Sequence, residues 1–115
     1  MHELSIAYSI VEIAGEEARK AEAISVSGIE LDIGLLAGVE FDAFDFAWPE
    51  AIKNTVLENA DRKINKIPGK AKCGRCGHVF DMQDYFELCP QCGAYENEVI
   101  SGKELKIRSI DITKI

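Results

Sequence analysis

The stretch Cys73-Gly-Arg-Cys76-Gly77 is followed by Cys89-Pro-Gln-Cys92-Gly93, with twelve residues between Cys76 and Cys89. All four cysteines of the chain lie in these two Cys-x-x-Cys pairs. Two residues between the cysteines of a pair let one tight turn direct both sulfurs at one ion, and the loop between the pairs lets the second pair complete a tetrahedron. A glycine after each pair suits a turn residue with positive φ. The pattern predicts a four-thiolate metal site, with zinc as the first choice of ion and iron as the second.

Two other interpretations of the cysteines are open: a pair of disulfides, or a redox-active Cys-x-x-Cys. Redox pairs usually occur singly, on a strand-to-helix turn, and disulfide scaffolds are usually secreted. The first residues lack the basic segment and apolar core of a secretory signal, and no run of about 18 apolar residues could span a membrane. We therefore expect a cytoplasmic metal-binding protein with no membrane partner.

The chain is acidic, and this net charge limits the kinds of partner that it can bind. The chain has 20 acidic and 13 basic residues in 115, a net charge of −7. Many zinc ribbons bind nucleic acid, but a phosphate-binding surface needs clustered Lys and Arg. We therefore expect no nucleic-acid partner, although a nucleic-acid-binding zinc ribbon and a rubredoxin-like electron carrier stay as alternative functions. No set of acid, base and nucleophile can be assembled, which predicts that the protein is not an enzyme.

Hydrophobic periodicity predicts two helices and three strands outside the cysteine region. The expected helices cover residues 4–22 and about 39–59, the second with a kink or break at Pro49. The expected strands cover residues 24–33, a short stretch that ends at Pro68, and residues 104–112. A strand thus leads into the cysteine region and another leads out of it.

This order predicts an α+β fold in which two helices pack on a three-stranded sheet, with an inserted zinc-ribbon module. The expected domains are residues 1–69 plus 99–115 for the α+β part and residues 70–98 for the ribbon. A module this small is expected to lack a hydrophobic core of its own and to be largely unfolded without metal. Monomer and homodimer are both compatible with such an insertion.

The amino terminus offers a second possible metal site. A bulky second residue such as His2 disfavours removal of the initiator Met1, so we expect a free α-amine next to the imidazole. The amine, a deprotonated backbone amide and the imidazole could chelate one ion, and nitrogen-rich tetragonal sites suit Ni(II) or Cu(II). Glu3 adds a nearby oxygen. The alternative is that the identity of residue 2 is arbitrary.

Four features in this order resemble the HypA/HybF family of hydrogenase nickel-insertion chaperones over nearly the whole chain. They are Met1-His2-Glu3, the Ile33-Gly34-x-x-x-Gly38-Val39-Glu40 turn, the two cysteine pairs, and the closing Gly102-x-Glu104-Leu105-x-Ile107-x-Ser109-Ile110 strand.

The resemblance implies a nickel metallochaperone that delivers Ni(II) to the immature large subunit of a [NiFe]-hydrogenase, with a HypB-type GTPase as a second partner. It implies nickel binding by Met1, His2 and Glu3, with Glu40 near the nickel end, and structural zinc on Cys73, Cys76, Cys89 and Cys92. Glu40 could equally be a solvated carboxylate at a helix start. Some relatives place a histidine beside each cysteine pair. Here His78 follows the first pair but Ala94 and Tyr95 follow the second, so the pattern linked to pH sensing is incomplete. Because four thiolates already close a structural zinc site, we expect His78 to be a neighbour of that site and not a ligand.

Overall fold

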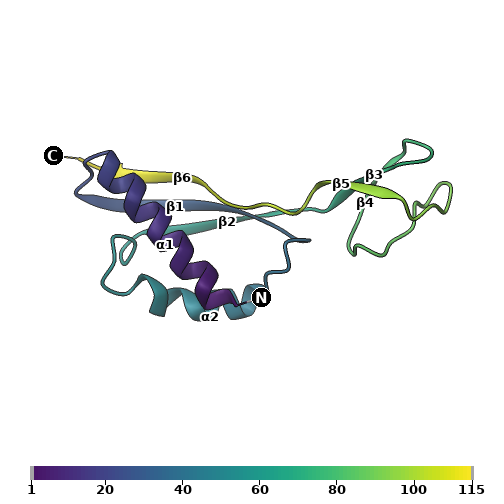
Figure 1. The fold of residues 1–115 in the computed structure, drawn as a ribbon. Coiled ribbons are helices and arrows are strands. Elements are labelled where there is room, and N and C mark those ends of the chain that lie inside the picture. The colour runs from purple at the N-terminus through teal and green to yellow at the C-terminus, as the bar shows by residue number, and fades with distance from the viewer. Residues whose placement is uncertain (1, 115) are drawn as a thin grey trace. The chain divides into compact units, whose positions relative to one another are not determined.

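The structure is a computed structural model that describes residues 2–114, and its chain forms two helices and six strands within that range (Figure 1). The elements are α1 (Glu3–Lys20), β1 (Ser25–Gly34), α2 (Phe41–Ile52), β2 (Asp61–Ile67), β3 (Lys70–Cys73), β4 (Val79–Asp81), β5 (Asn97–Ser101) and β6 (Leu105–Thr113). They fall into two compact units. The described part of unit 1 is residues 2–31, 39–65 and 106–114, and unit 2 is residues 32–38 and 66–105.

Helix α1 forms because small and apolar residues recur on one face at spacings of three and four. That face is buried and comprises Ala7, Ile10, Ala14 and Ala18. Glu3 in the first turn and Lys20 in the last complement the helix dipole. The helix ends at Lys20, and Glu22 beyond it takes a positive φ of 56°. The predicted helix over 4–22 is therefore confirmed to within two residues.

Helix α2 is shorter than the sequence predicts. It buries Phe44, Trp48 and Ala51 and ends at Ile52, so the expectation of a helix to residue 59 is wrong. Pro49 lies inside the last turn, where its ring removes a backbone N–H donor. Lys53 then leaves the helical region with ψ of 128°, and the chain continues through turns. The apolar residues that continue the stripe beyond Ile52, Val56 and Ala60, lie in or directly after these turns and are partly buried, and Leu57 between them is fully buried.

Unit 1 contains a three-stranded sheet in the order β2-β1-β6. The middle strand β1 is buried along most of its length, and its core side chains within unit 1 are Val26, Ile29 and Leu31. Arg62 of β2 lies over the rings of Phe44 and Trp48, with its guanidinium carbon 5.4 and 5.2 Å from the ring centroids. The two helices and three strands confirm the predicted α+β architecture.

Unit 2 contains a second sheet, in the order β4-β3-β5, with both pairings antiparallel. One face of this sheet is covered, and its buried residues form a small core that comprises Leu36, Ala71, Cys73, Phe80, Met82, Cys89 and Ala94. The expectation that the ribbon lacks a core is therefore wrong. Leu36 lies outside the predicted ribbon in sequence but packs in this cluster, since unit 2 includes residues 32–38 as well as 66–105. The domain boundaries at residues 69/70 and 98/99 stay a prediction.

Neither helix in residues 2–114 has the length and apolar character needed to cross a bilayer.

Candidate metal sites

Two turns of the same design position the four cysteines in unit 2. In the first turn, the Gly77 N–H donates to the Cys73 carbonyl at 3.0 Å; in the second, the Gly93 N–H donates to the Cys89 carbonyl at 2.8 Å. Both glycines take a positive φ, +77° and +78°, a region that side chains strongly disfavour. Because each turn folds tightly, both sulfurs of a pair project to the same side.

The sulfur atoms of these turns meet in one cluster. The four Sγ atoms of Cys73, Cys76, Cys89 and Cys92 all lie within 4.8 Å of one another. Across the two pairs, Cys73 is 3.5 Å from Cys92 and Cys76 is 3.6 Å from Cys89. Four sulfurs about 2.3 Å from a tetrahedral zinc ion would be about 3.8 Å apart, whereas a disulfide bond is about 2.05 Å. The cluster therefore fits a tetrathiolate zinc site, and all four cysteines are free of disulfides.

Backbone N–H groups near the sulfurs of Cys73 and Cys89 stabilise the thiolate form of these two cysteines. The N–H groups of Cys76 and Arg75 each lie 3.4 Å from the Cys73 sulfur, and they lower the pKa of Cys73 to about 6. Burial alone would raise the pKa of Cys89, but the N–H groups of Cys92 and Gln91 bring it below its ordinary value. Two of the four sulfurs thus favour the thiolate form that a metal ion requires.

Cys76 shows the opposite shift. The His78 backbone N–H favours its thiolate, but lost hydration and the neighbouring sulfurs outweigh that hydrogen bond and raise the pKa of Cys76 to about 12. Sulfurs this close cannot all ionise without a cation between them, because each added negative charge repels the others. The sulfur geometry and the opposed pKa shifts are those of a cation site.

His78 lies beside the cluster without joining it. Its ring is stacked on Phe80, with centroids 6.2 Å apart and planes inclined by 12°. Within residues 2–114, the metal-binding group comprises the four cysteines and excludes His78. This placement agrees with the sequence interpretation of His78 as a neighbour of the zinc site.

At the amino terminus, Met1 lies outside the described residues, and His2 is the N-cap residue of α1 with an exposed side chain. The His2 carbonyl accepts a hydrogen bond from the Ile6 N–H at 3.1 Å. Its imidazole makes no capping hydrogen bond among the described residues. The backbone of His2 is thus fixed by the helix, while its ring is presented to solvent.

Glu3 and Glu40 meet although 37 positions separate them. The Glu40 N–H donates to Oε2 of Glu3 at 3.0 Å, and this hydrogen bond is the main cause of the lowered pKa of Glu3. Glu40 is the N-cap of α2, and its own carboxylate accepts from the Asp42 N–H at 3.2 Å. Sequence reasoning placed Glu40 at a helix start and near the amino-terminal site, but it missed this bond. No local pattern marks a contact between two helix starts so far apart in sequence.

The fold and the sulfur cluster define a small α+β metal-binding protein that contains a tetrathiolate zinc ribbon. A profile of the family described as "Hydrogenase/urease nickel incorporation, metallochaperone, hypA" matches residues 1–112. The chain therefore belongs to the HypA family.

Individual relatives agree with this assignment. The chain is 45% identical over 114 residues to the hydrogenase maturation factor HypA of Parabacteroides distasonis, with 99% of each chain covered. It is 39% identical over 112 residues to the protein of the same name from Geobacter metallireducens, covering 97% of this chain and 99% of that one. The solution structure of the Ni metallochaperone HypA from Helicobacter pylori matches the whole chain with a TM-score of 0.73 at 22% identity, which shows a shared fold.

Proposed function

We propose that this protein is a nickel carrier that delivers Ni(II) to the immature large subunit of a [NiFe]-hydrogenase. On this proposal it works in the cytoplasm, as a monomer or homodimer, with a HypB-type GTPase as its second partner, and it catalyses no reaction itself. Membership of a nickel-incorporation family supports the proposal. One observation supports His2 as a nickel ligand: its imidazole is exposed, and its backbone is held in place by α1.

The start of α1 suits a chelate built from consecutive nitrogens. The first four N–H groups of a helix have no acceptor within the helix, so a metal that displaces the proton of the Glu3 amide breaks no helical hydrogen bond. The proposed nickel ligands are the Met1 amine, the His2 imidazole and the backbone amides of His2 and Glu3. Late first-row ions such as Ni(II) suit this nitrogen-rich set. An open chelate at an exposed chain end also leaves the ion accessible to an acceptor.

The Glu3 carboxylate has a different role in this proposal, because it already accepts a hydrogen bond from the Glu40 N–H. It acts as a positioning residue that fixes the start of α1 against the N-cap of α2. Glu40 contributes its backbone N–H to that contact and its carboxylate to capping α2. Neither carboxylate needs to contact nickel directly.

The four thiolates of the ribbon supply the zinc site, which the proposal treats as structural. Four sulfur ligands close the coordination shell of zinc, so no position is left open for a substrate. The ribbon therefore holds its zinc permanently, and nickel binds at the other site.

A transfer experiment tests the function. Zinc-loaded protein with an untagged amino terminus is charged with Ni(II) and mixed with purified large-subunit precursor in the presence of a chelator that captures free nickel. We expect nickel in the precursor from the wild type and chelator-bound nickel from His2→Ala. Equal transfer by both proteins would contradict the role of His2, and transfer by neither would contradict nickel delivery.

A further inference from the structure

The loop of residues 82–88 in unit 2 displays large apolar side chains to solvent. Phe86 is 91% exposed, and Tyr95, in a neighbouring segment, is 79% exposed. The Asn97 side-chain amide donates to the carbonyl of Glu87 at 3.2 Å and to that of Ala94 at 3.3 Å. These two bonds hold the segments together. We call the resulting set the ribbon loop surface; its exposed members are Tyr85, Phe86, Leu88 and Tyr95.

Hydrogen bonds fix the backbone that carries Phe86. Its N–H donates to Oδ1 of Asp84 at 2.7 Å, and the Glu87 N–H donates to the Asp84 carbonyl at 3.1 Å. The Gln83 N–H donates to Oε2 of Glu87 at 3.1 Å, which closes the turn from the other side. A nearly fully exposed phenylalanine on an ordered turn is pre-organised for a partner, so docking would cost little loop entropy.

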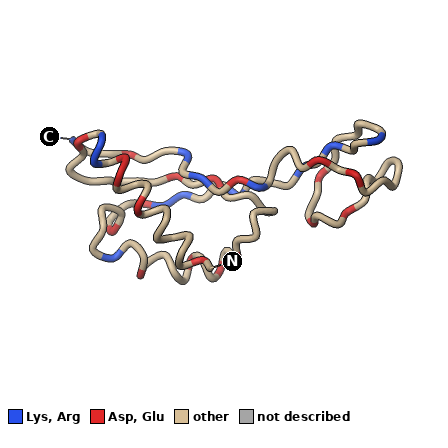
Figure 2. The backbone as a smooth tube through the Cα atoms, viewed as in Figure 1, with Lys and Arg blue, Asp and Glu red and all other residues tan. Residues whose placement is uncertain are grey.

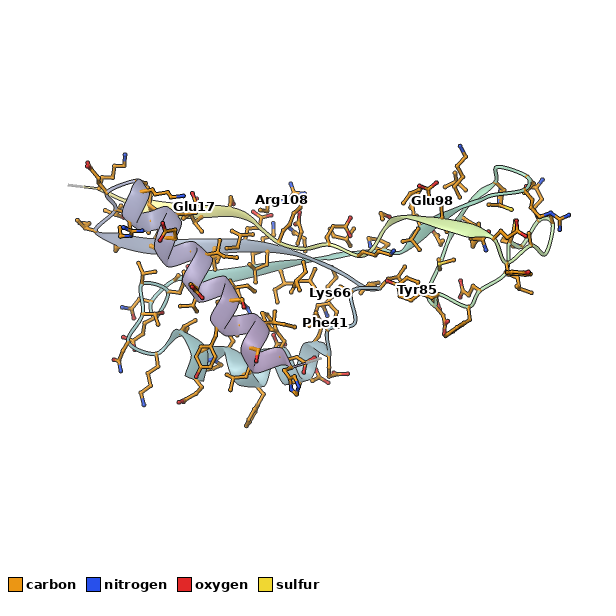
Figure 3. The ribbon with its side chains drawn as sticks, in the orientation of Figure 1. Glu17, Phe41, Lys66, Tyr85, Glu98 and Arg108 are labelled. Atoms are coloured by element: carbon orange, nitrogen blue, oxygen red, sulfur yellow. The ribbon has the colours of Figure 1, made fainter. Side chains whose placement is uncertain are left out.

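Tyr85 attaches the same loop to the rest of unit 2 (Figure 3). Its hydroxyl donates to the Leu36 carbonyl at 2.5 Å, and the Lys103 ammonium lies 5.6 Å from its ring centroid. Tyr85 thus makes contacts within unit 2, whereas the neighbouring Phe86 side chain is almost fully exposed.

Acidic residues predominate around this surface, and Lys103 beside the Tyr85 ring is a basic neighbour. Residues 79–102 contain no Lys or Arg, and their charged residues are Asp81, Asp84, Glu87, Glu96 and Glu98. Figure 2 shows acidic positions along this part of the ribbon and basic ones around the first cysteine turn. Such a surface repels nucleic acid, and a second copy of this chain, with its net charge of −7, is also repelled at long range. It complements a basic protein surface.

We propose that the ribbon loop surface is a docking site for a protein that presents an apolar pocket bordered by Lys and Arg, with Phe86 as the side chain that enters the pocket. This inference rests on the proposed function, because a nickel carrier must recognise a metal donor or acceptor protein. On this proposal the ribbon recognises the partner protein, and the amino terminus binds the nickel.

The experiment compares variants that all retain the nickel site. Phe86→Ala removes the anchor, and Phe46→Ala is its matched control, since Phe46 on α2 is 90% exposed. Asp84→Asn with Glu87→Gln removes two charges but keeps both oxygen acceptors of the turn. Affinity is measured for two purified probes, the hydrogenase large-subunit precursor and the GTPase, at salt concentrations from about 50 to about 300 mM, a range that shortens the screening length by a factor of about 2.4. Zinc content and nickel stoichiometry are measured on each variant.

We expect Phe86→Ala to weaken binding to one probe or both by about 30-fold, the scale of an aromatic hot spot, and Phe46→Ala to bind like the wild type. The double charge variant should bind more weakly at low salt and depend less on salt. Unchanged binding by Phe86→Ala, an equal loss in Phe46→Ala, or no binding of either probe by the wild type would overturn the docking site. Loss of wild-type nickel binding would instead overturn the proposed function.

Discussion

The zinc ribbon and the proposed nickel site at the amino terminus are built on opposite principles. The zinc ribbon takes its four ligands from two short motifs, brings the sulfurs within 4.8 Å of one another and buries two of them. The amino-terminal region depends on consecutive residues at an exposed helix start, held by a contact between Glu3 and Glu40. A closed thiolate cage retains its ion, and an open chelate at a chain end can release it. On the proposed function, the strong cysteine motif holds the structural metal, and the transferred metal is held where the sequence has only a short motif.

Metal removal is expected to separate the two regions most strongly. Structural zinc contributes on the order of 10 kcal/mol in ribbon-sized domains, so a strong chelator, or Cys73→Ser with Cys76→Ser, should unfold much of unit 2. The helices α1 and α2 belong to unit 1 and should persist. Amide NMR spectra before and after chelation would report each unit separately. A ribbon with unchanged chemical shifts after zinc removal would contradict the structural role of the metal.

The small core of unit 2 implies that packing as well as metal holds this region. A Cβ at Gly34 would lie 1.8 Å from the Gly102 carbonyl oxygen, so Gly34→Ala should destabilise the fold by about 1–3 kcal/mol. Gly15→Ala in α1 is the control, because a Cβ there meets no atom within 4 Å and alanine favours the helix by about 1 kcal/mol. Denaturant unfolding of both variants measures the contrast. Equal stability of the two would show that the close approach at Gly34 is unimportant.

His78 tests whether the ribbon is closed by its cysteines alone. His78→Ala should leave zinc stoichiometry and affinity unchanged and lower stability by about 0.5–1 kcal/mol, from the lost stacking on Phe80. Zinc release to a colorimetric chelator provides the measurement. A large increase in zinc release would place His78 in the coordination shell.

The Glu3–Glu40 contact predicts a pH dependence that belongs to the amino-terminal region. The pKa of Glu3 is below its ordinary value of 4.5 because its carboxylate accepts from the Glu40 N–H. A depressed carboxyl pKa adds stability above the unfolded-state pKa, and that stability is lost as the pH falls through the folded-state value. The stability difference between wild type and Glu3→Gln should therefore be present at pH 6 and shrink towards pH 3. Urea midpoints across this range would reveal it, and a constant difference would contradict the charge-assisted bond.

Sequence reasoning reached the local features and missed the long-range ones. The cysteine turns, the helix over Glu3–Lys20 and the three strands of unit 1 follow from short motifs and periodicity, and the structure has them all. The end of α2 was misplaced because the apolar spacing continues from Ile52 to Val56 and Ala60 through turns that are not helical. The contribution of Leu36 to the ribbon core and the bond between Glu3 and Glu40 depend on segments far apart in sequence, which no local pattern records.

On the proposed function, the amino terminus holds the nickel that is delivered and the ribbon holds the structural zinc. Nickel titration of zinc-loaded, untagged protein tests it most directly, with wild type and His2→Ala measured side by side and zinc quantified in each sample. We expect one tightly bound nickel in the wild type, loss of that nickel in His2→Ala, and one zinc per chain in both. Stoichiometric nickel binding by His2→Ala, or displacement of ribbon zinc by nickel in the wild type, would contradict it.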